Sequence, residues 1–310
     1  MPEKSHQPFI LVPEAALLAK LPEHQRTRFE KALSIMHKDI ASVMSWEQVA
    51  KQSAISPFHF HRQFTHVFHE TPGRYLGRIR LQYAVSMLFE YLSDNVTDIA
   101  LQCGYSSSQA LAKALKRDLN MTAKAIRHLG NTGTPEDINA LFEKLAHRDG
   151  SETPLENQLA EAMPCELKLL PDRALKRQPL PDLHFDDLCE KLGEKMLDIT
   201  FITQVPELEK SWNEEQHTAG TWVSPQPDVS CEDDTIIRIN AGHFLCCDVC
   251  LMSDIGYIAA IDGLFYHAEK LGYEIDQGGY CIEQITQLDM QPTGGLVLSL
   301  QIAVKVNTPN

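Results

Sequence analysis

The sequence predicts two folded parts: an all-α N-terminal domain with two helix-turn-helix motifs joined by a long helix, and a C-terminal α+β domain in which duplicated β-α-β-β modules form an antiparallel sheet. Three observations predict this fold class. Helical hydrophobic spacing with caps and turns dominates residues 25–128. Strand-like runs interrupted by two amphipathic helices dominate residues 165–306. A length of 310 residues is also enough for two hydrophobic cores.

Charge is divided unequally between the two parts. Residues 1–130 contain 16 Lys and Arg against 11 Asp and Glu, a balance of +5. Residues 131–310 contain 12 against 31, a balance of −19. Because an acidic surface repels phosphate, only the first part is suited to a nucleic acid.

The cysteine content and the hydropathy favour a cytoplasmic protein. The eight cysteines lie mostly in apolar stretches, and a chain of this length does not need disulfides as staples. We expect no signal peptide, and no apolar run approaches the roughly 20 residues of a membrane span. The sequence also indicates no cofactor.

The first elements are predicted from caps and spacing. Residues 1–24 form an N-terminal extension to which the sequence assigns no role. The first motif is Met44-SWEQVAKQSAISPFHFHRQFTHVF-His69. Ser45, with Gln48 three residues later, predicts a capping box for its first helix. Ser56 followed by Pro57 predicts the cap and first residue of its second helix.

A single long helix is predicted between the motifs, in Arg74-YLGRIRLQYAVSMLFEYL. Its apolar stripe consists of Leu76, Ile79, Tyr83, Met87 and Leu88. About 20 residues rising 1.5 Å each span roughly 30 Å, close to one turn of B-DNA. This helix would hold two recognition helices about one turn of DNA apart.

The second motif is Val96-TDIALQCGYSSSQALAKALKRDL-Asn120, which we expect to begin at Thr97 and to turn at Gly104. Residues 129–164 are expected to form a linker with one short helix near Ile138. The expected elements of residues 165–306 are strands at 166–170, 221–224, 234–239, 243–251, 279–285 and 295–306, and helices at 185–199 and 254–271.

Three stretches carry a family resemblance: Ser56-PFHFHRQF, Phe68-HETPGRYLGRIRLQYA and Ile99-ALQCGYSSSQALAKALKRDLNMTAKAIR. They resemble the AraC/XylS transcription regulators over about residues 25–128. Residues 165–306 are similar to the GyrI-like effector-binding domain, through the repeated β-α-β-β order and Glu283 within Gly279-YCIEQI. The resemblance implies a transcription regulator that binds double-stranded DNA and a small effector, with RNA polymerase as a candidate partner.

The sequence departs from the family pattern in two places. Asn120, Ala123 and Ile126 stand where the family has a glycine, a proline and an aromatic residue, although Thr122 and Arg127 agree. In the sensor part, Ile285 stands where the family often has an aromatic residue.

The DNA-reading residues implied by the resemblance are Phe58, His61 and Arg62 in the first motif and Ser108, Gln109 and Lys113 in the second. Arg62 can donate two hydrogen bonds to guanine, and Phe58 can contact a thymine methyl. Alternatively, Phe58 belongs to the core and Arg62 only contacts phosphate. The second motif is expected to read bases weakly because its recognition helix is rich in alanine. Further candidates for phosphate contact are Arg74, Arg78, Arg80, Lys116, Arg117, Lys124 and Arg127.

The candidate effector site centres on Glu283, because strand alternation places this carboxylate between inward-facing Cys281 and Ile285. Burying a lone carboxylate is costly, and a cationic ligand would offset that cost. The expected aromatic walls of this site are Trp222, Phe244, Tyr257 and Phe265. Alternatively, this face is exposed, or an internal Lys or Arg pairs with Glu283.

Other functions are weaker predictions. The acidic C-terminal part could instead dock a basic protein. Some GyrI-like domains hydrolyse reactive compounds, but no catalytic constellation is readable here, so we expect no enzyme. His243, Cys246, Cys247 and Cys250 lie close in sequence, yet strand alternation separates them, so we expect no metal site.

Overall fold

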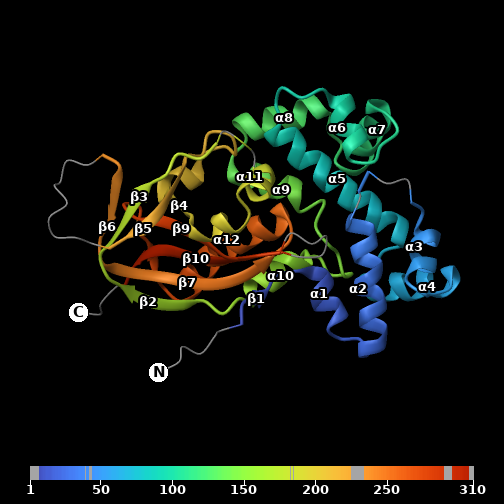
Figure 1. Ribbon diagram of the computed structural model, residues 1–310, viewed down its shortest axis with the longest axis horizontal. Helices are drawn as coiled ribbons and strands as arrows, with labels where there is room; N and C mark the ends of the chain where they lie inside the picture. Colours follow the sequence, from blue (N-terminus) through green and yellow to red (C-terminus); the bar gives the residue numbers. More distant parts are fainter. Residues whose placement is uncertain are drawn as a thin grey trace.

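The computed structural model describes residues 7–38, 40–41, 44–181, 183, 185–224, 234–289 and 295–306. Figure 1 shows a helical part and a part built on one sheet, placed side by side along the longest axis of the molecule. The sheet carries α12 (Asp254–Lys270) on one face. None of the described helices is both long and apolar enough to cross a membrane.

The first helix-turn-helix unit consists of α3 (Trp46–Gln52) and α4 (Pro57–Phe68), which pack with α2 (Glu23–Lys38). The Ser45 backbone N–H donates to Gln48 Oε1 at 2.8 Å, and α4 begins at Pro57 after Ser56, so both predicted caps are confirmed. Helix α4 turns its buried residues Phe60, Phe64 and Phe68 toward Phe29 of α2. This aromatic cluster fixes which face of α4 remains outside.

The predicted long helix is α5 (Pro72–Glu90), with 19 residues. Its buried face differs from the predicted stripe, since Tyr83 is 46% exposed whereas Leu81, Val85 and Phe89 are buried. The reason is that α5 serves two cores. Its first half packs with the first unit, through Tyr75 and Ile79, and its second half packs with the second unit on another side.

The second unit consists of α6 (Val96–Gln102), α7 (Ser108–Asp118) and α8 (Ala123–Thr132). Helix α6 is capped by Asn95, whose side chain accepts from the Thr97 backbone N–H, so it begins earlier than expected. The predicted turn is confirmed at Gly104, with φ +77°. Asn120 adopts φ +58°, a left-handed conformation that asparagine tolerates better than most residues.

The stretch expected to be a linker is more structured than its composition suggested. It holds the end of α8, α9 (Pro135–Phe142) and α10 (Leu155–Glu161). Ile138, Leu141 and Phe142 belong to the core of the second unit. Helix α10 packs against α12 of the sheet domain. These helices therefore join the two parts by packing.

The N-terminal extension contacts both parts of the molecule. Strand β1 (Phe9–Ile10) pairs in parallel with β7 of the sheet, with Phe9 opposite Val249. Helix α1 (Pro13–Leu18) then packs against α4 and α10. This segment therefore belongs to the sheet domain by its strand and to the helical domain by its helix.

The described residues of the sheet domain, together with β1, form one ten-stranded sheet in which the β1·β7 pair is parallel and the other described pairs are antiparallel. Apart from the two-residue strand β8, which lies between α12 and β9, the order β-α-β-β occurs twice, as β3-α11-β4-β5 and β7-α12-β9-β10. Strand β4 of the first run pairs with β9 of the second. The remaining bounds are β2 (Glu166–Leu170), β3 (Arg173–Arg177), α11 (Phe185–Leu192), η1 (Gly193–Asp198), β4 (Thr200–Gln204), η2 (Val205–Glu209), β5 (His217–Val223), β6 (Ile236–Ile239), β7 (Gly242–Leu251), β8 (Glu274–Ile275), β9 (Tyr280–Leu288) and β10 (Leu296–Lys305).

The first module differs from the predicted one. Its first strand is β3, whereas the expected strand at 166–170 is β2, which pairs with β7 at the sheet edge. The central strand β4 was not predicted. It is only five residues long and directly follows η1, so its residues do not show a separate alternating pattern.

Candidate functional site

The outer face of α4 carries the predicted reading residues of the first motif. Phe58 is 79% exposed, Arg62 is exposed, and the partly buried His61 ring lies 5.2 Å from Trp46. These residues line a shallow pocket together with Thr65 and His66. The alternative that Phe58 belongs to the core is wrong, because Phe60 and Phe64 occupy the buried side of α4.

The outer face of α7 carries no aromatic side chain, unlike that of α4. Gln109, Ala112 and Lys113 are exposed, whereas Ser108 is partly buried at the start of the helix. Leu111 and Leu115 fill the buried side. Figure 1 places α4 and α7 near the two ends of α5, on the side of the molecule turned away from the sheet. Both outer faces are therefore accessible to a partner.

Three of the arginines expected to contact phosphate instead donate hydrogen bonds within the protein. The Arg78 guanidinium donates to Glu70 Oε1 at 2.7 Å, that of Arg80 donates to the Ile40 carbonyl at 3.0 Å, and that of Arg127 donates to the Tyr91 carbonyl at 3.1 Å. Each holds a helix or loop in place, which the sequence did not reveal because local spacing cannot show a distant carbonyl. The exposed candidates are Arg74, Lys116, Arg117 and Lys124, of which Arg117 pairs with Asp118 at 2.6 Å.

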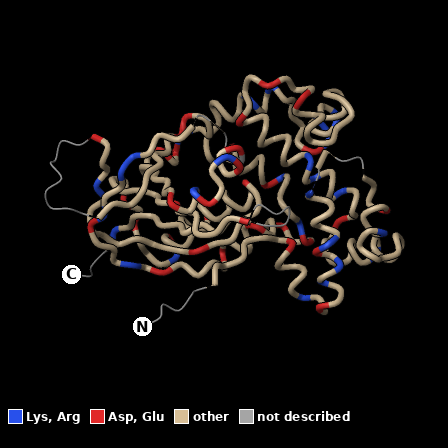
Figure 2. Tube along the Cα trace, in the orientation of Figure 1, with Lys and Arg blue, Asp and Glu red and all other residues tan. Residues whose placement is uncertain are grey.

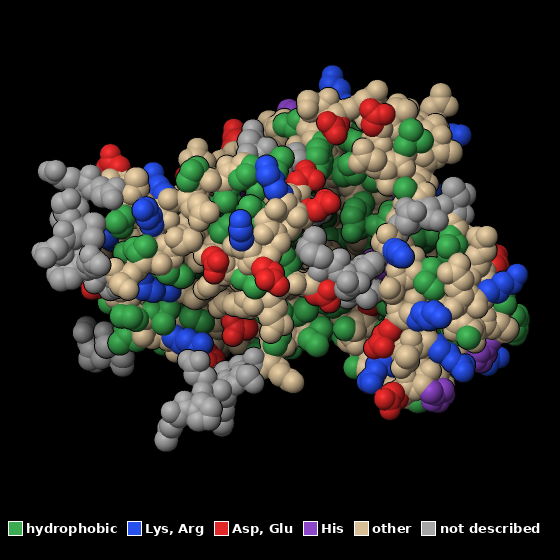
Figure 3. Space-filling view, viewed as in Figure 1, with side chains coloured by type: hydrophobic (Ala, Val, Ile, Leu, Met, Phe, Trp, Pro, Cys, Tyr) green, Lys and Arg blue, Asp and Glu red, His purple; other side chains and the backbone are tan. Residues whose placement is uncertain are grey.

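Basic side chains are not spread evenly over the surface. Lys, Arg and His side chains gather over the part of the surface formed by α2, α3 and α4 (Figure 3). Over the sheet domain, Lys and Arg alternate with Asp and Glu along the chain (Figure 2). The region around α4 is thus the best candidate surface for a polyanion.

Glu283 is buried within β9, with 7% of its surface exposed. It lies on the face of the sheet that packs against α12, from which the Tyr257 hydroxyl donates to Glu283 Oε1 at 3.0 Å. Burial raises the pKa of Glu283 to about 7, although the Tyr257 hydrogen bond opposes the shift. Among the described residues no Lys or Arg forms an ion pair with Glu283, so that alternative is not supported.

A second carboxylate, missed in the sequence, lies near Glu283. Burial, then the charges of Glu283 and Glu207, raise the pKa of Glu215 to about 7. Glu215 Oε1 has no hydrogen-bond partner among the described residues. His217 Nε2 lies 3.7 Å from this oxygen, and its Nδ1 lies 2.7 Å from Thr203 Oγ1. In the sequence, Glu214-Glu215 looks like an exposed acidic pair, and only the sheet brings it beside β9.

The predicted aromatic walls do not form one site. Tyr257 contacts Glu283, and Phe265 lies two turns further along α12 in the helix-side core. Trp222 and Phe244 lie on the opposite face of the sheet, in a cluster with Ile282. Their rings contact a cationic side chain of the protein itself.

The internal cation is Arg173. Its guanidinium carbon lies 5.0 Å from the Trp222 ring centroid and 4.8 Å from that of Phe244, and its Nη1 donates to Gln301 Oε1 at 2.8 Å. The prediction of Trp222 and Phe244 as walls beside Glu283 is therefore corrected. Strand alternation alone could not assign Phe244 and Glu283 to opposite faces of the sheet, because that assignment also needs the pairing of β7 with β10 and of β10 with β9.

The cysteines of β7 point to different sides. Cys246 packs in the cluster with Phe244, whereas Cys247 packs on the α12 side. Burial raises the pKa of the Cys246 thiol to about 11, which disfavours the thiolate that metals and oxidants need.

Comparisons with known proteins agree with the geometry of the helical part. A family model described as a helix-turn-helix domain matches residues 49–128. The HTH-type transcriptional activator RhaS of Escherichia coli O139:H28 is 32% identical over 121 residues. The N-terminal region is an AraC-family helix-turn-helix DNA-binding domain. The match covers 39% of this chain and 43% of that activator, so the chain spans less than half the length of this relative.

Two solved structures are similar to parts of the chain. A transcriptional regulator with an AraC-type DNA-binding domain from Chromobacterium violaceum has a TM-score of 0.32 and 24% identity, over 34% of this chain and 93% of that chain. SAV2435 bound to tetraphenylphosphonium has a TM-score of 0.30 and 10% identity, over 46% of this chain and 94% of that chain.

Proposed function

We propose that this protein is a sequence-specific transcription regulator whose AraC-family domain reads DNA and whose GyrI-like sheet domain binds a small cationic or amphipathic effector. The DNA half of the proposal is supported by the face of α4, where Arg62 and Phe58 project from a helix whose other side is locked by Phe60, Phe64 and Phe29. A rigid helix with an exposed arginine and aromatic residue suits readout of the major groove.

The effector half is supported by the carboxylates on the α12 side of the sheet. Glu283 and Glu215 each have a pKa raised to about 7, in part because the negative charge of Glu283 opposes that of Glu215. Two neighbouring buried carboxylates cannot both ionise cheaply without a positive partner. A ligand with a cationic or hydrogen-bond-donating group would supply it, with Tyr257 and His217 as further polar contacts.

The DNA half is tested by selecting bound sequences from a random duplex library with the full-length protein. An Arg62→Ala variant should lose the selected sequence preference, whereas Lys116→Ala should weaken binding to all sequences alike. If the wild-type protein selects no consensus sequence, DNA reading is refuted.

The effector half is tested separately, by thermal shift with a panel of lipophilic cations such as tetraphenylphosphonium. We expect a rise in Tm that is lost in both Glu283→Gln and Glu215→Gln and kept in the exposed-site control Glu214→Gln. A Tm unaffected by every cation would instead favour a C-terminal domain that docks a protein partner.

A further inference from the structure

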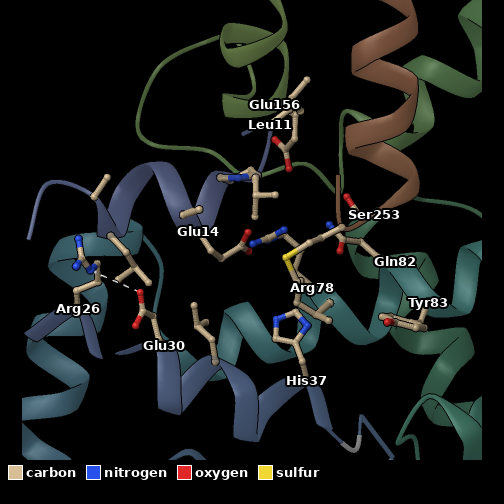
Figure 4. A pocket seen from close by; sticks show the side chains of 18 residues that line it. Leu11, Glu14, Arg26, Glu30, His37, Arg78, Gln82, Tyr83, Glu156 and Ser253 are labelled. Carbon is tan, nitrogen blue, oxygen red and sulfur yellow. Dashed lines mark ion pairs between the residues drawn. The ribbon is translucent and has the colours of Figure 1, made fainter. Parts of the chain in front are cut away.

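A cavity that is not lined by Glu283 lies where the two parts of the molecule meet. It has a volume of about 580 Å³. Its walls come from the N-terminal segment around α1, from α2 and α5 of the DNA-binding domain, from Glu156 of α10, and from Met252 and Ser253 before α12. Figure 4 shows side chains from all of these elements turned toward one space. The cavity therefore exists only while the two parts are docked.

Two carboxylates in this cavity form no ion pair within the described part of the chain, although the charge of Arg78 acts on both. The Tyr75 hydroxyl donates to Glu14 Oε1 at 3.0 Å, and the His147 backbone N–H donates to both oxygens of Glu156, at 3.1 and 3.0 Å. Glu156 is only 3% exposed. Among the residues that the structure describes, no Lys or Arg lies within ion-pair distance of either group. Each carboxylate can accept more hydrogen bonds than it receives.

The nearby cations are already engaged with other groups. Arg78 donates to Glu70 through both Nε and Nη2, at 3.0 and 2.7 Å, and to the Leu145 carbonyl at 3.3 Å. Arg26, at the rim, pairs with Glu30 at 3.6 Å (Figure 4). Counted with their partners, these arginines leave the charge of Glu14 and Glu156 in excess.

His37 does not balance that excess at neutral pH. It lies within hydrogen-bond distance of the Tyr75 hydroxyl, at 2.7 Å. Burial lowers the pKa of His37, against the opposing charge of Glu14. Burial by itself would raise the pKa of Glu14, but nearby positive charge, above all that of Arg78, lowers it, so Glu14 is ionised at neutral pH.

Apolar side chains make up much of the remaining wall, beside the polar groups of Gln82, Tyr83 and Ser253. The apolar lining residues include Leu11, Val12, Pro13, Leu18, Leu33, Ile79 and Met252. An apolar wall with unbalanced carboxylates is complementary to a molecule that has a cationic head and an apolar body.

We propose that this junction cavity is a second small-molecule site, which takes a compact amphipathic amine or amidine with its cationic head between Glu14 and Glu156 and its apolar body against the N-terminal segment. This site is independent of the effector site proposed at Glu283. Because its walls belong to both domains, the bound molecule holds α1, α5 and the start of α12 together, and thereby fixes the first helix-turn-helix unit relative to the sheet.

The proposal is tested by calorimetric titration of the full-length protein at pH 8 with benzamidine, phenethylamine and cyclohexylamine, each paired with a neutral analogue such as benzamide. At this pH both carboxylates are ionised, since burial raises the pKa of Glu156 to about 7. At least one cation should bind, and its neutral analogue should bind about tenfold more weakly or not at all.

Variants decide where binding occurs. Glu14→Gln and Glu156→Gln should each weaken the cation by about tenfold or more. Glu23→Gln, a matched control at an exposed carboxylate of α2 outside the cavity lining, and Glu283→Gln should leave the affinity unchanged. Ala15→Phe, which fills the cavity without removing a charge, should abolish binding, and deuterium exchange should show protection of residues 11–19 by the ligand.

Three outcomes would overturn the proposal: no cation binds, cations and neutral analogues bind equally, or binding survives Glu14→Gln and Glu156→Gln in correctly folded variants. Loss of binding in Glu283→Gln alone would assign the ligand to the sheet site and would also refute the second site.

Discussion

The two helix-turn-helix units share one topology but differ in what surrounds them. The first has an aromatic core, Phe29, Phe60, Phe64 and Phe68, and an outer face with Phe58, His61 and Arg62. The second has a mainly aliphatic core that also contains Phe89 and Phe142, and its outer face carries Gln109, Ala112 and Lys113. Under the proposed function, we therefore expect the first unit to distinguish bases better than the second.

The units also differ in their attachment to the sheet domain. The first contacts helix α1, and strand β1, which precedes α1 in the chain, pairs with the sheet. The second receives Trp212, which stacks on Phe89 with ring centroids 6.0 Å apart and lies 6.2 Å from Phe142. Ser211 Oγ donates to the Asn131 carbonyl at 2.9 Å beside it. The second unit therefore contacts a segment of the sheet domain directly, whereas the first is joined to it through α1.

One short segment connects this docking contact to the buried carboxylates. Trp212 lies three residues before Glu215, so the segment that follows η2 carries one end into the second unit and the other toward Glu283. Through Trp212, Glu215 is thus linked along the chain to the second unit rather than to the first.

The largest effect is expected from Trp212→Ala. Removing this side chain opens a space beside Phe89 and Phe142, and should lower the free energy of unfolding by about 2–4 kcal/mol in urea denaturation. Trp46→Ala in the first unit is the matched control and should cost about 1 kcal/mol, because Trp46 packs only at the edge of its core. Equal losses of stability in the two variants would contradict this difference in how the two units are attached to the sheet domain.

The next effect concerns DNA affinity. Arg62→Ala should weaken binding to the selected sequence by about 1–3 kcal/mol, because a bidentate contact with guanine is lost. Lys113→Ala should cost less and reduce the salt dependence of binding without changing sequence preference. Fluorescence anisotropy at several salt concentrations measures both. A larger loss of preference for Lys113→Ala would reverse the roles of the two units.

A smaller effect should follow the ionisation of Glu283. Its pKa rises from 4.5 to about 7 on folding, so the folded state binds more protons than the unfolded state, and stability falls as pH increases through this window. Glu283→Gln cannot ionise and should be more stable than wild type by about 1–2 kcal/mol at pH 8, with little difference at pH 4. Urea titrations at the two pH values would contradict this if the difference were absent or larger at pH 4.

The smallest effect is expected at the end of α7. Asn120 adopts φ +58°, so Asn120→Gly should change stability by only about 0.5 kcal/mol in either direction. Gly104→Ala is the contrasting variant in the same unit. A Cβ at this position, with φ +77°, would lie 2.5 Å from the Ile40 carbonyl oxygen, and should destabilise the second unit clearly in the same melting experiment.

Much of the local structure could be predicted from short-range chemistry. Ser45 with Gln48, Ser56 with Pro57, and Gly104 each act within a few residues, so the sequence shows their effect directly. Glu283 could be placed on an inward face for the same reason, since alternation in a strand is local. Its neighbours Glu215 and His217 could not be predicted, because they reach it only through the pairing of β4 with β5 and β9.

The sequence by itself determined the paired helix-turn-helix motifs, the helix between them, and the separation of charge, because hydrophobic period, caps and composition are properties of neighbouring residues. Only the tertiary structure decided that Arg173 occupies the Trp222–Phe244 pair, that Arg78 and Arg127 are internal, and that the N-terminal segment closes a cavity between the domains. The physical reason is that burial and ionic pairing depend on which distant surfaces meet. Residues 9 and 249, or 14 and 156, become neighbours only after the chain has folded.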